Sequence, residues 1–145
     1  MKIVKGLTEQ LLIDRYLGIP YKHRGRNLKG LDCWGLIIHI YKSIGIKVFD
    51  LESYEKKWSK KGKNYFVENY YSDWVPRKAP VFLDVILFRN QNNVVNHAGI
   101  YLSYSKVLQS TVKGVIITRF DDRINGKMDS IFRHIELTRG GDEDG

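Results

Sequence analysis

The sequence contains a single cysteine, Cys33, and no long uncharged apolar run. One cysteine excludes a disulfide within the chain and a zinc site built from several cysteines. A stretch of about 18 uncharged apolar residues is absent, so we expect no transmembrane helix. The first six residues lack the apolar run and small-residue cleavage site of a secretory signal peptide, so we expect no export by that route.

The composition is that of a folded domain with excess positive charge. The 145 residues are 43% hydrophobic and 28% charged, and 24 basic against 16 acidic residues leave a net charge of +8. We predict one domain over residues 1–139 and an acidic, flexible tail over residues 140–145. The charge suits a polyanionic partner, either nucleic acid or an acidic wall polymer. No nucleic-acid motif accompanies it, so nucleic acid is the less favoured partner.

The pattern of apolar residues changes from helical to strand-like along the chain. Thr8 is suited to cap a helix that begins near Glu9, and Asp32 to cap a helix over Cys33–Ile44. Residues 21–31 indicate a loop, and aromatic residues before Pro76 favour a short helix. Helices followed by an antiparallel meander indicate an α+β fold. The predicted strands, rich in β-branched and aromatic residues and separated by turn sequences, are 81–88, 94–102, 106–110, 115–120 and 131–137.

Cys33 is the first candidate for chemistry because it falls at the predicted start of a helix. Unpaired amides and the helix dipole favour an anion there, so the pKa of the thiol is expected to fall below its usual value of about 8.5. From its position alone, a buried structural cysteine is an equally good interpretation.

A nucleophilic thiol needs a base, and the sequence offers four histidines. His39 follows Cys33 by six residues on the same predicted helix and therefore lies off its face. His97 precedes Ala98 and Gly99, whose small size lets another element approach closely, so His97 is the favoured partner. Gln109 on the next predicted strand can accept a hydrogen bond from the imidazole and set its tautomer. Without Cys33 and His97, Gln109 is better explained as an ordinary polar residue of a strand.

Several stretches occur in the order found in the NlpC-type cell-wall peptidases of the papain-like superfamily. Residues 16–21 (Tyr-Leu-Gly-Ile-Pro-Tyr) and 31–36 (Leu-Asp-Cys-Trp-Gly-Leu) resemble the family's Gly-x-Pro-Tyr and Asp-Cys-Ser-Gly-Leu motifs. Residues 83–88 (Leu-Asp-Val-Ile-Leu-Phe) and 97–101 (His-Ala-Gly-Ile-Tyr) resemble its later Gly-Asp-Leu-Val-Phe-Phe and His-Val-Gly-Ile-Tyr. The resemblance covers about Leu11 to Phe120.

The resemblance implies an α+β, papain-like NlpC-type domain in which N-terminal helices pack on a C-terminal antiparallel β-sheet. It implies a thiol peptidase with Cys33 as nucleophile, His97 as base and Gln109 as the residue that orients His97. Cys33 would attack a peptide carbonyl to give an oxyanion and then an acyl-enzyme, while His97 protonates the leaving amine and later activates water. This chemistry requires neither a cofactor nor a metal.

The resemblance also assigns the substrate side of the site. Tyr21 matches a family tyrosine near the nucleophile, and its hydroxyl and the Cys33 N–H are the expected oxyanion donors. Asp32 and the residue after the cysteine, here Trp34, hold positions where the family binds the free amino end of its substrate. The implied substrates are peptidoglycan peptides, typically cleaved at γ-D-glutamyl bonds of the stem peptide.

Three positions depart from the family pattern. Trp34 replaces the usual serine, Arg24-Gly25-Arg26 replaces a Gly-Gly loop, and Leu83 replaces the glycine before Asp84. Cleavage specificity therefore stays open. The Asp-Cys-Trp-Gly form resembles phage tail-associated members, which favours a virion component, present in the host cytoplasm before assembly, with tail proteins as further partners. The alternative is a catalytically modified tail-assembly module that keeps the fold.

Overall fold

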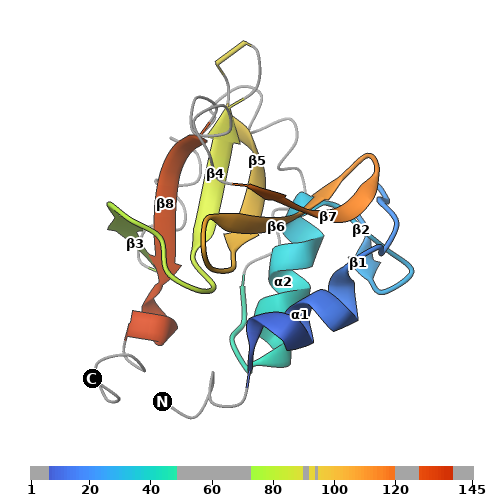
Figure 1. Cartoon of the computed structure of the whole chain (residues 1–145), viewed down its shortest axis with the longest axis horizontal. Helices are drawn as coiled ribbons and strands as arrows, with labels where there is room; N and C mark the ends of the chain where they lie inside the picture. The colour runs from blue at the N-terminus through green and yellow to red at the C-terminus, as the bar shows by residue number, and fades with distance from the viewer. Residues whose placement is uncertain (1–6, 49–72, 90–91, 94, 120–127, 139–145) are drawn as a thin grey trace.

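The computed structural model describes residues 7–48, 73–89, 92–93, 95–119 and 128–138. In these ranges two helices precede a six-stranded antiparallel sheet, and a two-stranded hairpin lies between the helices in the chain (Figure 1). This arrangement confirms the α+β prediction. The acidic tail and the aromatic residues before 73 lie outside the described residues, and the domain limits stay a prediction. Neither of the described helices is long and apolar enough to cross a membrane.

Helix α1 (Glu9–Tyr16) begins where the capping pattern predicts. The Thr8 side chain accepts a hydrogen bond from the Leu11 N–H at 3.1 Å, which satisfies one of the unpaired amides of the first turn. Leu12 and Tyr16 are buried on its inner face. Gly18, with φ +88°, ends the segment and pairs its N–H with the carbonyl of Val115. The helix is thus tied at its end to the sheet.

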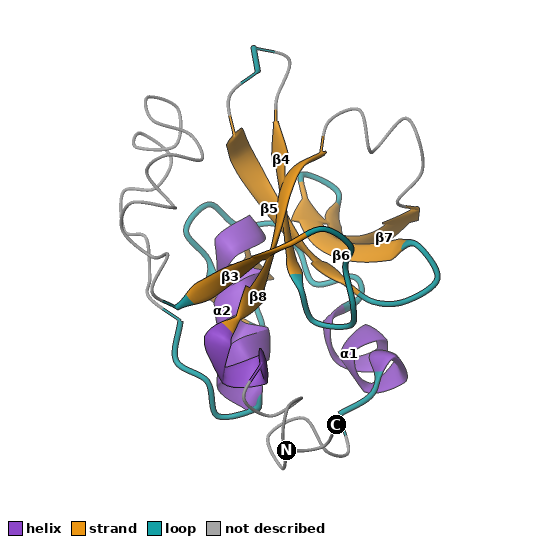
Figure 2. Ribbon diagram, turned by 90° about the vertical axis from the view of Figure 1, so that its left-hand side faces the viewer, coloured by secondary structure: helices purple, strands orange, loops and turns teal. Residues whose placement is uncertain are grey.

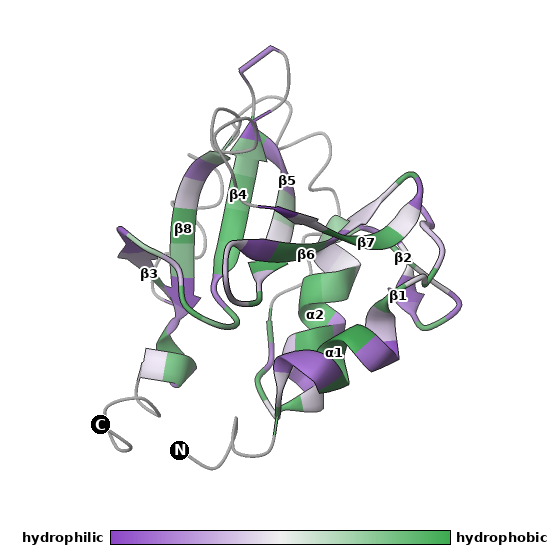
Figure 3. Cartoon of the chain, in the orientation of Figure 1, coloured by the Kyte–Doolittle hydropathy of each residue, from purple (hydrophilic) through white to green (hydrophobic). Residues whose placement is uncertain are grey.

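Helix α2 (Cys33–Ser43) is the central element of the core. Asp32 is its N-cap and accepts from the Gly35 N–H at 2.7 Å, and Ile44 with Gly45 (φ +82°) closes its end. The prediction of a helix from Cys33 to Ile44 is therefore confirmed to within one residue. The helix packs against two neighbouring strands of the sheet, and most of its ribbon has the green colours of hydrophobic residues in Figure 3.

The large sheet has the strand order β3-β8-β4-β5-β6-β7, with every pair antiparallel. The strands β4 to β7 form the predicted meander, and both helices lie at the same end of the sheet in Figures 1 and 2. The bounds are β3 (Trp74–Arg77), β4 (Val85–Arg89), β5 (Val95–Tyr101), β6 (Lys106–Thr111), β7 (Gly114–Arg119) and β8 (Met128–His134).

Strand β8 departs from a simple meander because it returns to pair with β4. Residues 85–88 are all buried, and β4 is a central strand that pairs with β5 on one side and β8 on the other. An ion pair reinforces this contact: Arg133 of β8 donates to Asp84, just before β4, at 2.8 Å. The predicted last strand was too long, since residues 135–138 form a helical turn.

A short helix was expected before Pro76. In the described part of that segment, from residue 73 onward, this expectation is wrong. Trp74 and Pro76 both lie in β3, an edge strand that pairs with β8. Proline lacks an N–H and is tolerated at the edge of a sheet, where one side needs no partner. The Trp74 indole packs edge-on against His134 with ring centroids 4.8 Å apart. Tertiary packing of this indole outweighs the local helical pattern.

Apolar side chains fill both faces of the sheet. The main core lies between α2 and the sheet and includes Leu36, Ile40, Ile100 and Leu108, all with 0% exposed surface. A smaller cluster on the opposite face is formed by Ile86, Phe88, Val107 and Ile131. Because side chains alternate along a strand, β4 contributes to both clusters. The sheet is therefore a rigid support for residues that project from β5 and β6.

Candidate active site

Cys33 occupies the first position of α2, as predicted. It forms no disulfide, and 6% of the residue is exposed. The preceding Leu31 is held on two sides, because its N–H donates to the carbonyl of Pro20 at 3.0 Å and its carbonyl accepts from the Ser110 hydroxyl at 2.6 Å. Ser110 lies in β6. The start of α2 is therefore anchored to the sheet rather than to its own loop alone.

The segment predicted as a loop contains a short hairpin of β1 (Arg26–Asn27) and β2 (Gly30–Leu31). The hairpin packs tightly on the first turn of α2. A Cβ placed on Gly35 would lie 2.0 Å from the Gly25 carbonyl oxygen, which no real side chain can occupy. Two-residue strands have no measurable periodicity, so the sequence pattern could not reveal them.

Asp32 is almost fully buried, with 1% of its surface exposed. Its Oδ1 accepts from the Gly35 N–H at 2.7 Å and from Arg26 Nη1 at 2.8 Å, and its Oδ2 accepts from the Arg24 N–H at 3.0 Å. The carboxylate thus organises both the hairpin and the start of α2. The predicted contact of Asp32 with substrate stays a prediction, and the structure adds this architectural role.

His97 and Gln109 lie on the neighbouring strands β5 and β6 and form the expected hydrogen bond. His97 Nε2 is 2.6 Å from Gln109 Oε1. Gln109 Nε2 in turn donates to Thr118 Oγ1 of β7 at 2.6 Å. Since the amide nitrogen donates to Thr118, the amide oxygen faces His97 and accepts a hydrogen bond from its Nε2–H. The remaining ring nitrogen, Nδ1, is then the one able to act as a base.

Burial lowers the pKa of His97, and the hydrogen bond to Gln109 opposes that shift. The centroid of the ring also lies 5.7 Å from that of the Phe88 ring on β4. Gly99 allows β5 and β6 to approach at this point, because a Cβ there would be 2.8 Å from Val107 Cγ1. Helix α2, which begins at Cys33, packs against both strands. The fold therefore brings all three predicted catalytic residues onto adjoining elements.

Tyr21 is 39% exposed and its backbone forms an isolated bridge with Leu31, so it lies beside the segment that leads into Cys33. Its role as an oxyanion donor stays a prediction. Trp34 has 0% exposed surface and packs on Trp74 with ring centroids 6.3 Å apart. Its place on the substrate side of the site stays a prediction.

Two other histidines serve packing. His39 Nδ1 is 2.7 Å from the Tyr16 hydroxyl, and its place off the face of Cys33 agrees with the prediction. His134 packs against Trp74 and Tyr41. Within the described part of the chain, no three His, Cys, Asp or Glu side chains gather as metal ligands would.

Sequence reasoning missed Thr118, the residue that orients Gln109. A usable signal was present: the Lys113-Gly114 turn sets a register in which Ile116 pairs with Gln109. Thr118, two residues further, then lies diagonally on the same face. Arg26 was also overlooked, because its partner becomes apparent only in the folded hairpin.

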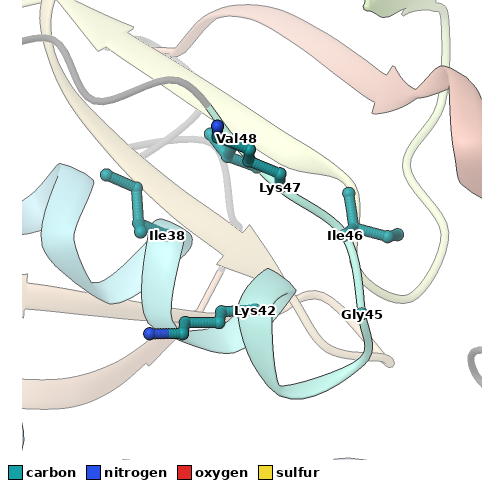
Figure 4. A pocket seen from close by; sticks show the side chains of 6 residues that line it. All are labelled: Ile38, Lys42, Gly45, Ile46, Lys47 and Val48. Carbon is teal, nitrogen blue, oxygen red and sulfur yellow. The ribbon is translucent and has the colours of Figure 1, made fainter.

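A separate pocket of about 460 Å³ lies at the far end of α2 from Cys33. Figure 4 shows the side chains that line it: Ile38, Lys42, Gly45, Ile46, Lys47 and Val48. Most of its lining is aliphatic, and it contains none of the predicted site residues. It is therefore distinct from the candidate site.

The family model of NlpC/P60 matches residues 18–133. This chain belongs to the NlpC/P60 family. The match includes Cys33, His97 and Gln109, and it confirms the resemblance seen in the motifs. No curated protein matches the chain significantly.

Solved structures of NlpC/P60 proteins share the fold. An NlpC/P60 family protein from Bacillus cereus is 23% identical, with a TM-score of 0.62 over 88% of this chain and 40% of its own. The NlpC/p60 domain of the peptidoglycan hydrolase SagA is 16% identical, with a TM-score of 0.55 over 88% of this chain and 97% of its own. The peptidoglycan hydrolase RipB from Mycobacterium tuberculosis is 17% identical, with a TM-score of 0.54 over 86% and 63%. The chain thus spans about 40% of the length of the Bacillus cereus protein.

Proposed function

We propose that this NlpC/P60 domain is a cysteine peptidase that hydrolyses stem-peptide bonds of peptidoglycan. The observation that carries the proposal is the chain of hydrogen bonds from His97 through Gln109 to Thr118. His97 and Gln109 lie on β5 and β6, which both pack against the helix that begins with Cys33. A histidine held in one tautomer has a clear use beside a nucleophile and little use in packing alone. Two of the structurally similar proteins are peptidoglycan hydrolases.

In the proposed reaction His97 Nδ1 takes the proton of the Cys33 thiol. The thiolate attacks the peptide carbonyl carbon, and the resulting oxyanion is stabilised by the Cys33 N–H and the Tyr21 hydroxyl. The C–N bond breaks as His97 returns the proton to the leaving amine. Water, deprotonated by His97, then hydrolyses the thioester and frees Cys33. Gln109 keeps the imidazole in the tautomer that both proton transfers require.

Replacing the nucleophile tests the proposal directly. We expect wild-type protein to release soluble peptide fragments from purified peptidoglycan, measured by mass spectrometry. Cys33→Ala should release none, and His97→Ala should lower kcat by about 10²–10⁴-fold because it removes the general base. Val112→Ala, an exposed turn residue, serves as the control and should match wild type. Equal release by wild type and Cys33→Ala, or none from either across several wall chemotypes, contradicts the proposal.

We also propose that the protein acts within a phage tail, with peptidoglycan peptides and tail proteins as partners. The Asp-Cys-Trp-Gly motif supports this location. The alternative, a tail-assembly module, is favoured by Trp34, which is buried against Trp74. Particles that carry the Cys33→Ala variant separate the two. If the protein is a hydrolase, these particles assemble but lack the lytic activity of wild-type particles. If it is an assembly module, wild-type and Cys33→Ala particles are both without lytic activity. Mass spectrometry of purified particles checks the location.

A further inference from the structure

Arg26 links the β1–β2 hairpin to the start of α2 through a single nitrogen. Its Nη1 donates to Asp32 Oδ1 at 2.8 Å and to the Gly25 carbonyl at 2.9 Å. The Arg26 side chain is 24% exposed, whereas the Asp32 side chain is 1% exposed. The pair is therefore a partly buried ion pair next to the candidate nucleophile in the chain, and is less screened than a surface pair.

The pair lies directly over the first turn of α2. A Cβ on Gly35 would be 3.1 Å from Arg26 Nη1 and 3.2 Å from Asp32 Oδ1. Asp32 also caps the helix through the Gly35 N–H. The same carboxylate oxygen thus accepts from the guanidinium and from a helix amide, which places the positive charge at the helix end where Cys33 begins.

An aspartate at this position has two opposing effects on a thiolate. As an N-cap it stabilises the helix whose unpaired amides favour an anion at Cys33. As a buried negative charge beside Cys33 it disfavours a second anion there. A guanidinium bound to Asp32 removes the second effect and keeps the first.

We propose that Arg26 is a positioning residue for Cys33: it holds Asp32 as the cap of α2 and neutralises that carboxylate beside the nucleophile. Arg26 acts through Asp32 and needs no contact with substrate. The proposal deepens the proposed function and rests on Cys33 being its nucleophile. Thiol reactivity is measured without substrate, however, so the two proposals can fail separately.

The elements that pack against α2 carry other charged and titratable groups besides Arg26 and Asp32. On β6, Lys106 binds Glu9 of α1, and the Tyr101 hydroxyl of β5 accepts from the Ser105 N–H; both contacts lie at the β5–β6 turn. The remaining titratable or charged groups on β5 and on the segment from residue 21 through the β1–β2 hairpin are Tyr21, Lys22, His23, Arg24, Arg26, Lys29 and His97.

The test measures the rate of Cys33 alkylation by iodoacetamide against pH. Arg26→Met should raise the midpoint of this profile by about one pH unit, because it leaves the Asp32 carboxylate unneutralised. Arg26→Lys, which keeps the charge, should retain most of the wild-type midpoint. The matched control is Arg24→Met, two residues earlier in the same loop, whose backbone N–H but not its side chain bonds Asp32. It should leave the midpoint unchanged.

A second replacement separates charge from folding. Asn is an equally good N-cap, so Asp32→Asn combined with Arg26→Met removes the carboxylate charge and retains the cap. This double variant should return the midpoint to the wild-type value. Circular dichroism establishes that each variant is folded, and if Arg26→Met is not, the double variant and Arg26→Lys supply the comparison. An unshifted midpoint in folded Arg26→Met, an equal shift in Arg24→Met, or a double variant that departs from wild type overturns the proposal.

Discussion

Both the oxygen and the nitrogen of the Gln109 amide form hydrogen bonds, and these bonds determine which nitrogen of His97 can accept a proton. The oxygen faces His97 and the nitrogen is held by Thr118. A neutral acceptor sets the tautomer without strongly stabilising the imidazolium, while burial lowers the pKa of His97. The imidazole therefore stays neutral, and able to accept a proton, to a lower pH than a solvated histidine. His97 and Gln109 were predictable from motifs, whereas Thr118 required the register of β6 and β7.

Removing the Thr118 hydroxyl should weaken this arrangement without unfolding the protein. Thr118→Val leaves the Gln109 amide free to rotate, at a cost of about 0.5–1.5 kcal/mol for one hydrogen bond. We expect kcat to fall by about 3–10-fold with KM little changed, since Thr118 has no substrate contact in the proposed mechanism. Thr118→Ser keeps the acceptor and should restore kcat. An unchanged kcat in Thr118→Val, measured by steady-state release of peptide from peptidoglycan, would show that Gln109 needs no such support.

Helix α2 and the β1–β2 hairpin form one structural unit around Cys33. The Asp32 cap made the start of α2 predictable, because capping depends on residues within one helical turn. The hairpin was not predictable, because its two-residue strands are held by contacts with the helix. Gly35 is where the two meet, and only a glycine allows the Gly25 carbonyl to come so close.

A methyl group at this contact should separate hairpin and helix. Gly35→Ala must displace the Gly25 backbone, so we expect the free energy of unfolding to fall by about 2–3 kcal/mol and peptide release to fall with it. Ser43→Ala, at the other end of α2, is the matched control and should change stability by less than about 0.5 kcal/mol. Urea unfolding followed by circular dichroism measures both. Similar stability of the two variants would contradict the close approach of the hairpin.

The fold shields three of the four histidines from water, His134 almost fully and His39 and His97 in part. Burial is the largest cause that lowers the pKa of each of them, namely His39, His97 and His134. In the unfolded chain these groups take up protons near pH 6.5. The folded state binds fewer protons in that range, so its stability rises with pH there.

Acidification should therefore destabilise the fold before the carboxylates titrate. The stabilisation is fully present above about pH 7 and is lost as pH falls through 6.5 towards 5. We expect the free energy of urea unfolding to decrease across this window. His134→Gln should flatten the decrease, because one buried neutral histidine is removed. Equal slopes in wild type and His134→Gln would rule out this linkage.

Local chemistry was sufficient to predict the α+β class, the cap at Asp32, the start of α2 and the meander from β4 to β7. These features depend on a few neighbouring residues: a capping side chain, the spacing of apolar positions and the residues of turns. The return of β8 to β4, the edge position of Pro76, the burial of Trp34 and the Arg26–Asp32 pair depend instead on which distant segments meet. No short-range sequence pattern predicts these tertiary contacts, because they result from the packing of the complete core.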